Sequence, residues 1–358
     1  MKKTIHSTAE LARHLGLSRW SVSRAINGQD GVSLETAGQV RAAMEEFSFA
    51  PSPHGRALRG HRTGTIGICF RALDTPVTIE KIAHVQRLVG ARGYRPLFEL
   101  TELDERMGSD VINHFISLRV EGVLFVDTPP GPRSAEWLKR LKKQGIPAAH
   151  LEPLGPVAHN AVHLDRPAAM AQVTEHLLAL GHTRFALMGV GRESPFGRPR
   201  YEGVARALAT RGLEAEEHIE VWDFPHQRPA GLRYGHALAE KLLAVKRRPS
   251  ALLAVNDEVA AGVMWGLQKA GCVIPRDFSI FGFDNLILSE QTTPALCTVD
   301  HQVEAVAAAA AAMLFTLIKC GPAARLPIVK IPPKLVLRDS VAARHGRGKP
   351  PVIFQFKR

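Results

Sequence analysis

A short stretch near the amino terminus, residues 8–27, constrains the fold most, because its pattern is that of two helices joined by a tight turn. Ser7 followed three residues later by Glu10 has the spacing of a capping box, which predicts the start of the first helix. Gly16 ends that helix, and Ser18 can cap the second one. The pattern therefore predicts a helix-turn-helix unit.

A third helix, predicted to begin near Ser33, supplies the remaining apolar face of this unit. Its apolar residues recur at helical spacing, at Ala37, Val40, Met44 and Phe47. They close a small three-helix core, so residues 1–50 are predicted to form a separate domain. The second helix then presents outward the side chains that could enter a DNA groove: Ser18, Arg19, Trp20, Ser21, Ser23, Arg24 and Asn27. The alternative is an ordinary helical bundle whose basic residues form a solvated face.

The segment after this domain favours DNA binding over the plain bundle. Ser52 is a cap residue, Pro53 suits the first helical position and Gly60 ends the pattern, so residues 51–62 are predicted to hold a two-turn helix and a linker. Isolated helices shorter than about 12–15 residues are marginal in water. This helix is therefore expected to order only against a partner.

Together these motifs resemble the lactose-repressor (LacI/GalR) family of bacterial transcription regulators. The resemblance rests on the head, on the run Val22-Ser-Arg-Ala-Ile-Asn27, on the turn Phe49-Ala-Pro51 and on the hinge Ala57-Leu-Arg-Gly60, and it extends to about residue 340. It implies a homodimeric repressor that binds a pseudo-palindromic operator in double-stranded DNA.

The resemblance also implies roles for single residues in DNA contact. Arg19, Trp20 and Arg24 match the family's major-groove positions, where an arginine can donate two hydrogen bonds to a guanine edge. Leu58 matches the hinge leucine that each subunit wedges between base steps in the minor groove, and Arg56 lies in the same helix. Trp20 departs from the family and suits apolar contact with a thymine methyl or a sugar, so the operator cannot be taken from a relative.

Length and composition set outer bounds on this interpretation. A chain of 358 residues exceeds what one core usually supports, so two or three domains are expected. The formal net charge of +12 favours an anionic partner, and attraction to DNA phosphates is its simplest use. The four cysteines are widely spaced, which indicates reduced core thiols. With neither an apolar signal segment nor a run of eighteen apolar residues, the chain is expected in the cytoplasm and not in a membrane.

From residue 65 onward, short apolar runs alternate with amphipathic segments, which is the pattern of an α/β fold with parallel strands. The predicted strands include 65–70, 122–126, 185–188, 251–255 and 279–283. The predicted helices are 79–92, 103–119, 134–144, 166–180, 198–212, 257–271 and 301–319. We expect two doubly wound lobes, like those of periplasmic binding proteins.

The family resemblance, rather than the residue pattern, places the boundary between the lobes. It implies that the chain crosses between them near 163–165, 290–294 and 323–327. The body, 63–340, then divides into lobe 1, at about 63–163 and 293–325, and lobe 2, at about 164–292 and 326–340. The basic tail, 341–358, has no acids and no leucine heptad, and we expect it to be disordered, the alternative being a nonspecific contact with DNA phosphates.

Polar residues follow several of these strands, at the edge where open α/β sheets bind ligands. Asn256 and Asp257 follow one strand and Asp284 another, while Arg200 opens a helix after the loop that follows 185–188. A carboxylate and a guanidinium facing each other can hold the vicinal hydroxyls of a sugar. The alternatives are a helix cap for Asp257, which its position favours, and a surface ion pair for Arg200.

The family resemblance assigns effector-binding roles to particular residues. Arg200, Asn256 and Asp284 match the family's effector-binding arginine, asparagine and aspartate. Phe224 lies where relatives stack an aromatic ring on the ligand, and Glu152 where some carry an aspartate. The resemblance thus implies a small sugar or sugar derivative bound between the lobes.

Arg71 adds a hypothesis about the charge of that effector. It ends the first strand, in a turn that departs from the usual turn of the family. Because its guanidinium could sense a negative charge there, we hypothesise an acidic or phosphorylated sugar.

No cofactor or metal is predicted. Ser194 stands where a dinucleotide fingerprint beginning at Gly189 would need its third glycine, which favours a plain loop. His159 and His163 lie on a loop entering a strand, where a spacing of four does not bring two rings together as it does on a helix.

Two functions remain as alternatives to an effector-controlled regulator. An enzyme acting on sugars would need a general acid and base, for which Glu152 and Asp284 are the candidates. An architectural DNA binder would respond to no effector. The motifs favour the regulator, in which closure of the lobes on the effector changes operator affinity.

Overall fold

The computed structural model of the chain describes residues 5–26, 28–49, 62–73, 75–101, 105–129, 132–224 and 231–344. Its contacts divide it into two compact units. The first comprises Met1–Gly64 with Ser117–Arg119 and holds the N-terminal helices. The second comprises Thr65–Ile116 and Val120–Arg358 and holds the α/β body.

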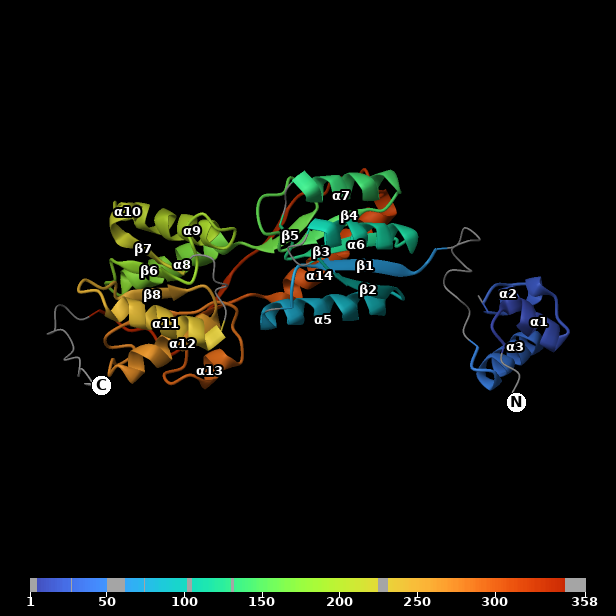
Figure 1. Cartoon of the computed structure of the whole chain (residues 1–358), viewed down its shortest axis with the longest axis horizontal. Helices are drawn as coiled ribbons and strands as arrows, with labels where there is room; N and C mark the ends of the chain where they lie inside the picture. Colours follow the sequence, from blue (N-terminus) through green and yellow to red (C-terminus); the bar gives the residue numbers. More distant parts are fainter. Residues whose placement is uncertain are drawn as a thin grey trace. The chain divides into compact units, whose positions relative to one another are not determined.

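Three helices form the first unit (Figure 1): α1 (Thr8–Leu15), α2 (Arg19–Ile26) and α3 (Leu34–Glu46). The expected cap residues begin two of them. The Ser7 hydroxyl accepts a hydrogen bond from the Glu10 N–H at 3.2 Å, and the Ser33 hydroxyl accepts one from the Thr36 N–H at 3.1 Å. Gly16 ends α1 at a φ of +65°, a conformation that glycine adopts without strain. The local signals therefore fixed the helix ends correctly.

Apolar residues from all three helices meet in one small core: Ile5, Leu11, Ala12, Val22, Val40, Ala43 and Phe49. Met44 and Phe47, which were expected in this core, pack at its margin. The helix-turn-helix prediction is confirmed.

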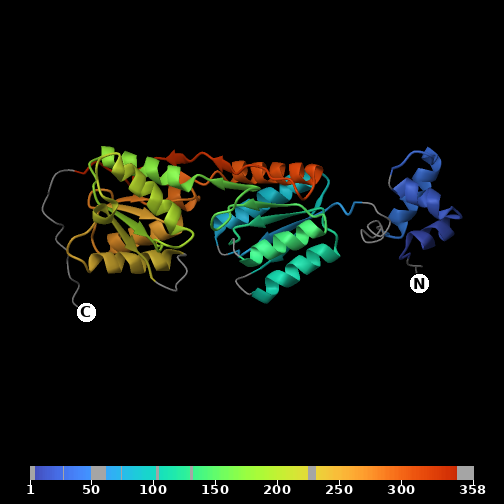
Figure 2. The ribbon, with the colours of Figure 1, turned by 90° about the horizontal axis from the view of Figure 1, so that it is seen from above.

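A six-stranded parallel sheet organises the first part of the body, in the order β11-β5-β4-β3-β1-β2. Its strands are β1 (Thr65–Phe70), β2 (Arg95–Leu100), β3 (Gly122–Val126), β4 (Ala148–Leu151), β5 (Ala161–Leu164) and β11 (Val329–Ile331). Its helices are α5 (Pro76–Ala91), α6 (Glu105–Ser117), α7 (Pro132–Lys143) and α14 (Val303–Cys320). Figures 1 and 2 show α5 and α14 on one face and α6 and α7 on the other. We call this part lobe 1.

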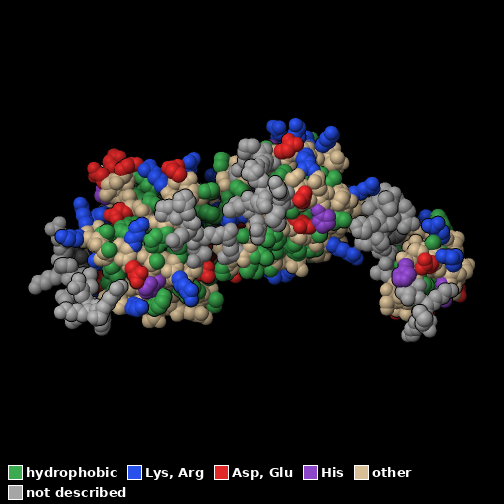
Figure 3. Space-filling model, in the orientation of Figure 1, with side chains coloured by type: hydrophobic (Ala, Val, Ile, Leu, Met, Phe, Trp, Pro, Cys, Tyr) green, Lys and Arg blue, Asp and Glu red, His purple; other side chains and the backbone are tan. Residues whose placement is uncertain are grey.

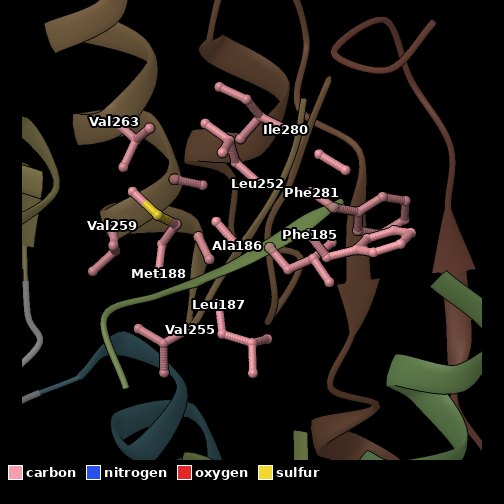
Figure 4. Packing of buried hydrophobic residues seen from close by; sticks show 14 of the residues in the cluster. Phe185, Ala186, Leu187, Met188, Leu252, Val255, Val259, Val263, Ile280 and Phe281 are labelled. Atoms are coloured by element: carbon pink, nitrogen blue, oxygen red, sulfur yellow. The ribbon is translucent and has the colours of Figure 1, made fainter. Parts of the chain in front are cut away.

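A four-stranded parallel sheet, in the order β7-β6-β8-β9, organises lobe 2. Its strands are β6 (Phe185–Met188), β7 (Ile219–Trp222), β8 (Ala251–Ala254) and β9 (Ser279–Phe281). Its helices are α8 (Arg166–Ala179), α9 (Gly197–Ala209), α10 (Ala215–His218), α11 (Gly231–Leu243), α12 (Asp257–Lys269) and α13 (Leu288–Gln291). Figure 4 shows side chains of β6, β8 and β9 packed against Val259 and Val263 of α12.

Helices α11 and α12 approach each other closely enough for their backbones to touch. A Cβ atom at Gly235 would lie 2.2 Å from the carbonyl oxygen of Val259, and one at Gly262 would lie 2.2 Å from that of Leu232. No side chain fits at either position. This contact fixes the position of α12, at whose N-terminal end lie two of the candidate site residues, the cap Asn256 and the first helical residue Asp257.

Strand pairing shows where the chain passes between the two sheets. β5 ends at Leu164 and α8 begins at Arg166, which agrees with the passage expected near 163–165. Isolated β-bridges join Phe281 to Cys297 and Asp284 to Asp300, so the chain stays with lobe 2 as far as residue 300. The second passage was expected earlier, near 290–294.

The last passage also comes later than expected. β11 at 329–331 still belongs to the sheet of lobe 1, and only β12 (Lys334–Val336) returns to lobe 2, where it pairs antiparallel with β10 (Thr298–Asp300). The expected position was 323–327. These short strands satisfy backbone groups that a loop would leave unpaired, which is why the passages lie beyond them.

Helix α14 is the one element in the described part of the chain that is long and apolar enough to cross a membrane, with a mean hydropathy of 1.8. It contains Glu304 and Lys319, so it is not an uninterrupted apolar run. Its residues Val306, Ala310 and Leu314 are buried in the core of lobe 1. The segment predicted as a helix at 301–319 is therefore a core helix.

The cysteines differ in one respect from expectation. Cys69, Cys272 and Cys297 are reduced and buried, as predicted for core thiols. Cys320 is exposed, because it lies on the last turn of α14, where the helix leaves the core.

Candidate functional site

The outer face of α2 carries the residues predicted to contact DNA. The Ser18 hydroxyl accepts a hydrogen bond from the Ser21 N–H at 2.9 Å and so caps the helix. Ser18, Arg19 and Trp20 are exposed, and 59% of the Trp20 surface is open to solvent. Ser21, Ser23 and Arg24 are half-buried. The Trp20 ring is therefore accessible to a partner at the outer face of α2.

Arg24 is held in place by its neighbours. Its guanidinium carbon lies 4.8 Å from the centre of the Trp20 ring, one helical turn away. Its Nε donates to the Asp30 carbonyl oxygen at 2.5 Å. Arg24 therefore orients the tryptophan, and Arg19 is the arginine of this helix that stands clear of such contacts among the described residues.

Three predicted DNA contacts, Asn27, Arg56 and Leu58, lie outside the described residues, as do the proposed hinge helix and residues 345–358 of the basic tail. Their roles stay predictions. The start of the tail, 341–344, is not disordered as expected, because the Arg344 N–H donates to the Leu180 carbonyl oxygen at 2.8 Å.

In the body, charged side chains gather where strands of both lobes end. Glu152 follows β4, Arg166 follows β5, Asp284 lies shortly after β9, and His301 follows β10. These carboxyl ends of strands are the usual ligand-binding edge of open α/β sheets. Together with Arg200 of α9, we call them the inter-lobe cluster.

Glu152 is the most enclosed member of the cluster, with no exposed surface and a backbone φ of +56°. Its Oε1 accepts from the Leu164 N–H at 2.6 Å, its Oε2 forms an ion pair with Arg166, and the His301 Nε2 lies 3.7 Å from its Oε1. Burial alone would raise the pKa of Glu152, but the Arg166 guanidinium and the His301 ring hold that pKa well below its usual value. Glu152 is therefore a buried carboxylate.

His301 connects the carboxylates of the two lobes. Its Nδ1 lies 3.0 Å from Oδ1 of Asp284, and its Nε2 faces Glu152. The ring is 3% exposed and packs edge-on against Phe283. A change in the distance between the lobes would change at least one of these contacts.

Arg200 is buried without a carboxylate partner. Its two terminal nitrogens donate to the carbonyl oxygens of Phe196 at 2.8 Å and Val255 at 2.9 Å, and its guanidinium carbon lies 4.6 Å from the Phe283 ring centre. Its Nε has no hydrogen-bond partner among the described residues. Burial, and then the positive charge of Arg166, lower the pKa of Arg200 to about 9. The surface ion pair considered as its alternative is therefore wrong.

The cap of α12 is Asn256, not Asp257. The Asn256 side-chain oxygen accepts from the Val259 N–H at 2.9 Å. Asp257 instead points inward and accepts from the Leu286 N–H at 2.7 Å and the Thr298 hydroxyl at 2.6 Å. Burial, and then the charge of Asp284, raise the pKa of Asp257 to about 8. The cap prediction failed because these partners lie far along the chain.

Two other predicted effector residues are Phe224 and Arg71. Phe224 is half-buried, 5.5 Å from the Tyr234 ring and 5.1 Å from the Lys241 ammonium, just before 225–230, which lie outside the described residues. Arg71 is half-buried directly after β1. Whether either touches an effector stays a prediction.

A second buried ion pair was missed. Lys81 of α5 is 2% exposed and lies 2.8 Å from Oδ1 of Asp127, which follows β3 and accepts from the Thr78 hydroxyl at 2.9 Å. The signal was present, because Lys81 continues the inward series of Val77, Val85 and Val89 at every fourth position. Arg166 and His301 were missed because neither belongs to a strand end recognisable from apolar runs.

Among the described residues, no group of three or more histidine, cysteine, aspartate or glutamate side chains could hold a metal ion. The inter-lobe cluster combines carboxylates, guanidinium groups and an imidazole in a buried place. Such groups can bind hydroxyls and a negative charge by charge-assisted hydrogen bonds.

Comparison with known proteins matches both units of the chain. Residues 7–52 match the model of bacterial regulatory proteins of the lacI family, and residues 174–341 match that of a periplasmic binding protein-like domain. The transcriptional regulator DegA of Bacillus subtilis (strain 168) is 29% identical over 346 residues, which cover 96% of this chain and 99% of DegA. The ribose operon repressor of Escherichia coli (strain K12) is 29% identical over 296 residues, covering 82% of this chain and 87% of the repressor.

A solved structure shares the same fold over nearly the whole chain. The lac repressor dimer bound to operator and the anti-inducer ONPF aligns with a TM-score of 0.84 at 22% identity, covering 95% of this chain and all of that one. The expected architecture, a helix-turn-helix head followed by a parallel α/β body, is confirmed.

Proposed function

Because the chain belongs to the LacI family of bacterial regulatory proteins, we propose that it is a transcriptional repressor whose operator affinity is controlled by a sugar-like effector. The observation that carries this proposal is the combination of two sites in one chain. An outward helix presents Arg19 and Trp20, and a body with a periplasmic-binding-protein fold holds a buried cluster of charges at its strand ends.

The head reads DNA through α2. Arg19 is exposed and donates to a guanine edge in the major groove, while Trp20, held by Arg24, contacts a thymine methyl or a sugar. Leu58 of each hinge enters the minor groove between the half-sites. The protein acts as a homodimer, so its operator is a pseudo-palindrome. Its place is the cytoplasm, where its DNA is.

The inter-lobe cluster binds the effector. Arg200 supplies an unpaired guanidinium nitrogen, and Asn256 and Asp284 complete a set of groups that recognise hydroxyls. The name of the ribose operon repressor supports a sugar as the class of effector. Arg200 and Arg71 favour a sugar that carries an acidic group.

A binding role suits this cluster better than catalysis. An enzyme would use Glu152 and Asp284 as a general acid and base. Glu152, however, is fully enclosed, and its oxygens are engaged by the Leu164 N–H and by Arg166. The protein is therefore proposed to bind its sugar without turning it over.

The first test is selection of bound sequences from random duplex DNA by the full-length protein, with Arg19→Ala and Leu58→Ala in parallel. We expect a pseudo-palindromic site, relaxed base preference at one position in Arg19→Ala, and weaker binding by Leu58→Ala. Recovery of unselected DNA by all three proteins would contradict sequence-specific recognition and leave only phosphate attraction.

The second test is a thermal-shift screen of neutral and acidic sugars. An effector should raise the unfolding temperature of the parent protein and of the Arg19→Ala variant, but not of Asp284→Ala. It should also change operator affinity. A sugar that is consumed during the assay would show an enzyme, and a protein that no sugar stabilises would be an architectural DNA binder. An acidic effector should lose its advantage over its neutral analogue in Arg71→Ala.

A further inference from the structure

Lobe 1 contains a separate cavity of about 420 Å³, away from the inter-lobe cluster. It lies between α7, strand β4, the loop 156–160 and the segment 322–325. This volume lies within the range of small-molecule sites, which is roughly 300–1,000 Å³. None of the members of the inter-lobe cluster lines it.

The charges around this cavity have one sign. Lys139 and Lys142 of α7 and Arg325 lie at its wall, and no aspartate or glutamate is among its lining residues. Within the described part of the chain, none of these three cations forms an ion pair. Figure 3 shows lysine and arginine side chains gathered along α7. Neighbouring cations repel one another, and a bound anion would reduce this electrostatic repulsion.

Two histidines of the cavity wall carry ring nitrogens without partners. His150 is 6% exposed and stacks on Phe125 at 5.4 Å, and its Nδ1 has no hydrogen-bond partner among the described residues. The Nδ1 of His159 is likewise buried and unpaired. Buried polar groups are normally paired, so these ring nitrogens are available to hydrogen-bond a molecule in the cavity.

The surrounding positive field acts on both rings. Burial, and then the neighbouring His159, lower the pKa of His150 to about 4. Burial, followed by the charges of Arg325 and Lys142, lowers the pKa of His159. An anion in the cavity would oppose these charges.

The wall of the cavity is held in shape before any ligand arrives. Asn160, at a φ of +56°, ties the loop 156–160 to the segment beside it. Its side-chain oxygen accepts from the Leu326 N–H at 2.7 Å, and its amide nitrogen donates to the Ala324 carbonyl oxygen at 3.3 Å. A preformed site loses less entropy when it binds.

We propose that this cavity, which we call the basic pocket, is a second small-molecule site that binds a phosphate group, either inorganic phosphate or the phosphate of a small ester. Lys139, Lys142 and Arg325 bind the phosphate oxygens, and the imidazoles of His150 and His159 hydrogen-bond to it. A dianion matches three uncompensated cations better than a single carboxylate does. The apolar wall, which includes Leu138, Ile146 and Val157, covers the rest of an ester.

The test is calorimetric titration of the full-length protein with inorganic phosphate and with glycerol 3-phosphate at constant ionic strength in chloride. We expect one saturable site per chain. Lys142→Gln and Arg325→Gln should each weaken it about tenfold or more, because each removes a charge-assisted hydrogen bond. Tighter binding of glycerol 3-phosphate would identify an ester as the ligand, and equal binding would identify the phosphate alone.

The matched control is Lys143→Gln, which removes the same charge from the same exposed helix but does not line the cavity. Its affinity should equal that of the parent protein. Arg19→Ala should also bind phosphate normally, because it alters only the head. The proposal is overturned by the absence of saturable binding, by equal weakening in Lys142→Gln and Lys143→Gln, or by loss of binding in Arg19→Ala.

Discussion

The body holds two groups of charges that are arranged in opposite ways. In the inter-lobe cluster, Glu152 meets Arg166, and Asp284 meets His301, so most charges have a partner within the protein. In the basic pocket, no acid is among the lining residues, and within the described residues Lys139, Lys142 and Arg325 form no ion pair. The comparison teaches that burial of a charge and its availability to a ligand are separate properties. A matched, buried charge supports the fold, whereas an unmatched cation at a cavity wall is free to bind an anion.

The largest expected effect comes from breaking a matched pair. Glu152→Gln should lower the free energy of unfolding by about 3–5 kcal/mol, because Arg166, which is only 15% exposed, would lose its counter-ion. Denaturant unfolding of the purified protein measures this. Glu136→Gln, on the exposed face of α7, serves as the control.

A double variant sharpens the same point. Glu152→Gln combined with Arg166→Met removes both charges, and should recover part of the lost stability. If the double variant were less stable than either single variant, the pair would not act as a matched unit.

A smaller effect is expected at the second ion pair. Lys81→Met keeps the apolar stem of the side chain and removes its ammonium, which leaves Asp127 with the Thr78 hydroxyl alone. We expect a loss of about 1.5–3 kcal/mol, the usual range for a hydrogen bond to a charged group. Denaturant unfolding curves measure the stability of Lys81→Met and of the exposed control Lys143→Met. An equal loss of stability in both variants would show that the burial of Lys81 does not matter.

Asp257 is expected to make the stability of the folded protein depend on pH. Burial, and then the Asp284 charge, raise its pKa from 3.8 to about 8, so between these values the folded protein holds a proton that the unfolded chain has released. Stability from this group is therefore present at low pH and is lost as the pH rises toward about 8.

The unfolding temperature, measured at intervals of pH, tests this directly. Asp257→Asn cannot ionise, and its amide can still accept from the Leu286 N–H, so its profile should be flatter than that of the parent protein. Asp339→Asn, at an exposed position, should leave the profile unchanged. A parent protein that grows more stable over this range would show that other groups dominate.

The smallest effect on stability is expected in the basic pocket. Lys142→Gln should change the free energy of unfolding by less than about 0.5 kcal/mol, since the side chain is exposed and unpaired. Its phosphate affinity should nevertheless fall. A large loss of stability in this variant would remove the contrast between the two groups of charges.

Local signals predicted the head and five strands of the two parallel sheets well, while β2, β4, β5 and β7 were not among the strands named from the sequence. Ser7, Ser33 and Gly16 act within one turn of their own positions, so a cap or a stop can be read from adjacent residues. The strands β1, β3 and β6 have the predicted bounds because each is a buried apolar run. The short strands β10, β11 and β12 carry no such run, and the positions where the chain leaves each lobe were expected too early.

The candidate site was less predictable because its contacts join distant parts of the chain. Asn256 and Asp257 are equally good cap residues, and only Leu286 and Thr298, brought close by the fold, assign the cap to the first. The sequence pattern predicts that Arg166 begins a helix, and nothing near it in the sequence marks it as the partner of Glu152. The family resemblance implied roles for single residues, but it did not show which residues they contact.

The position of α14 in the chain affects how the protein is made. This helix covers one face of the lobe 1 sheet, whose first five strands end at Leu164, yet α14 ends only at Cys320. At roughly 5–20 residues per second, a ribosome needs about 8–30 s to add the 156 residues between these points. During that interval the apolar face of the nascent sheet has no helix α14 to cover it, while most of lobe 2 has already been synthesised. Lobe 1, although it begins first, is therefore completed only after most of lobe 2 has been synthesised, and its exposed face is the natural place for a chaperone to act during synthesis.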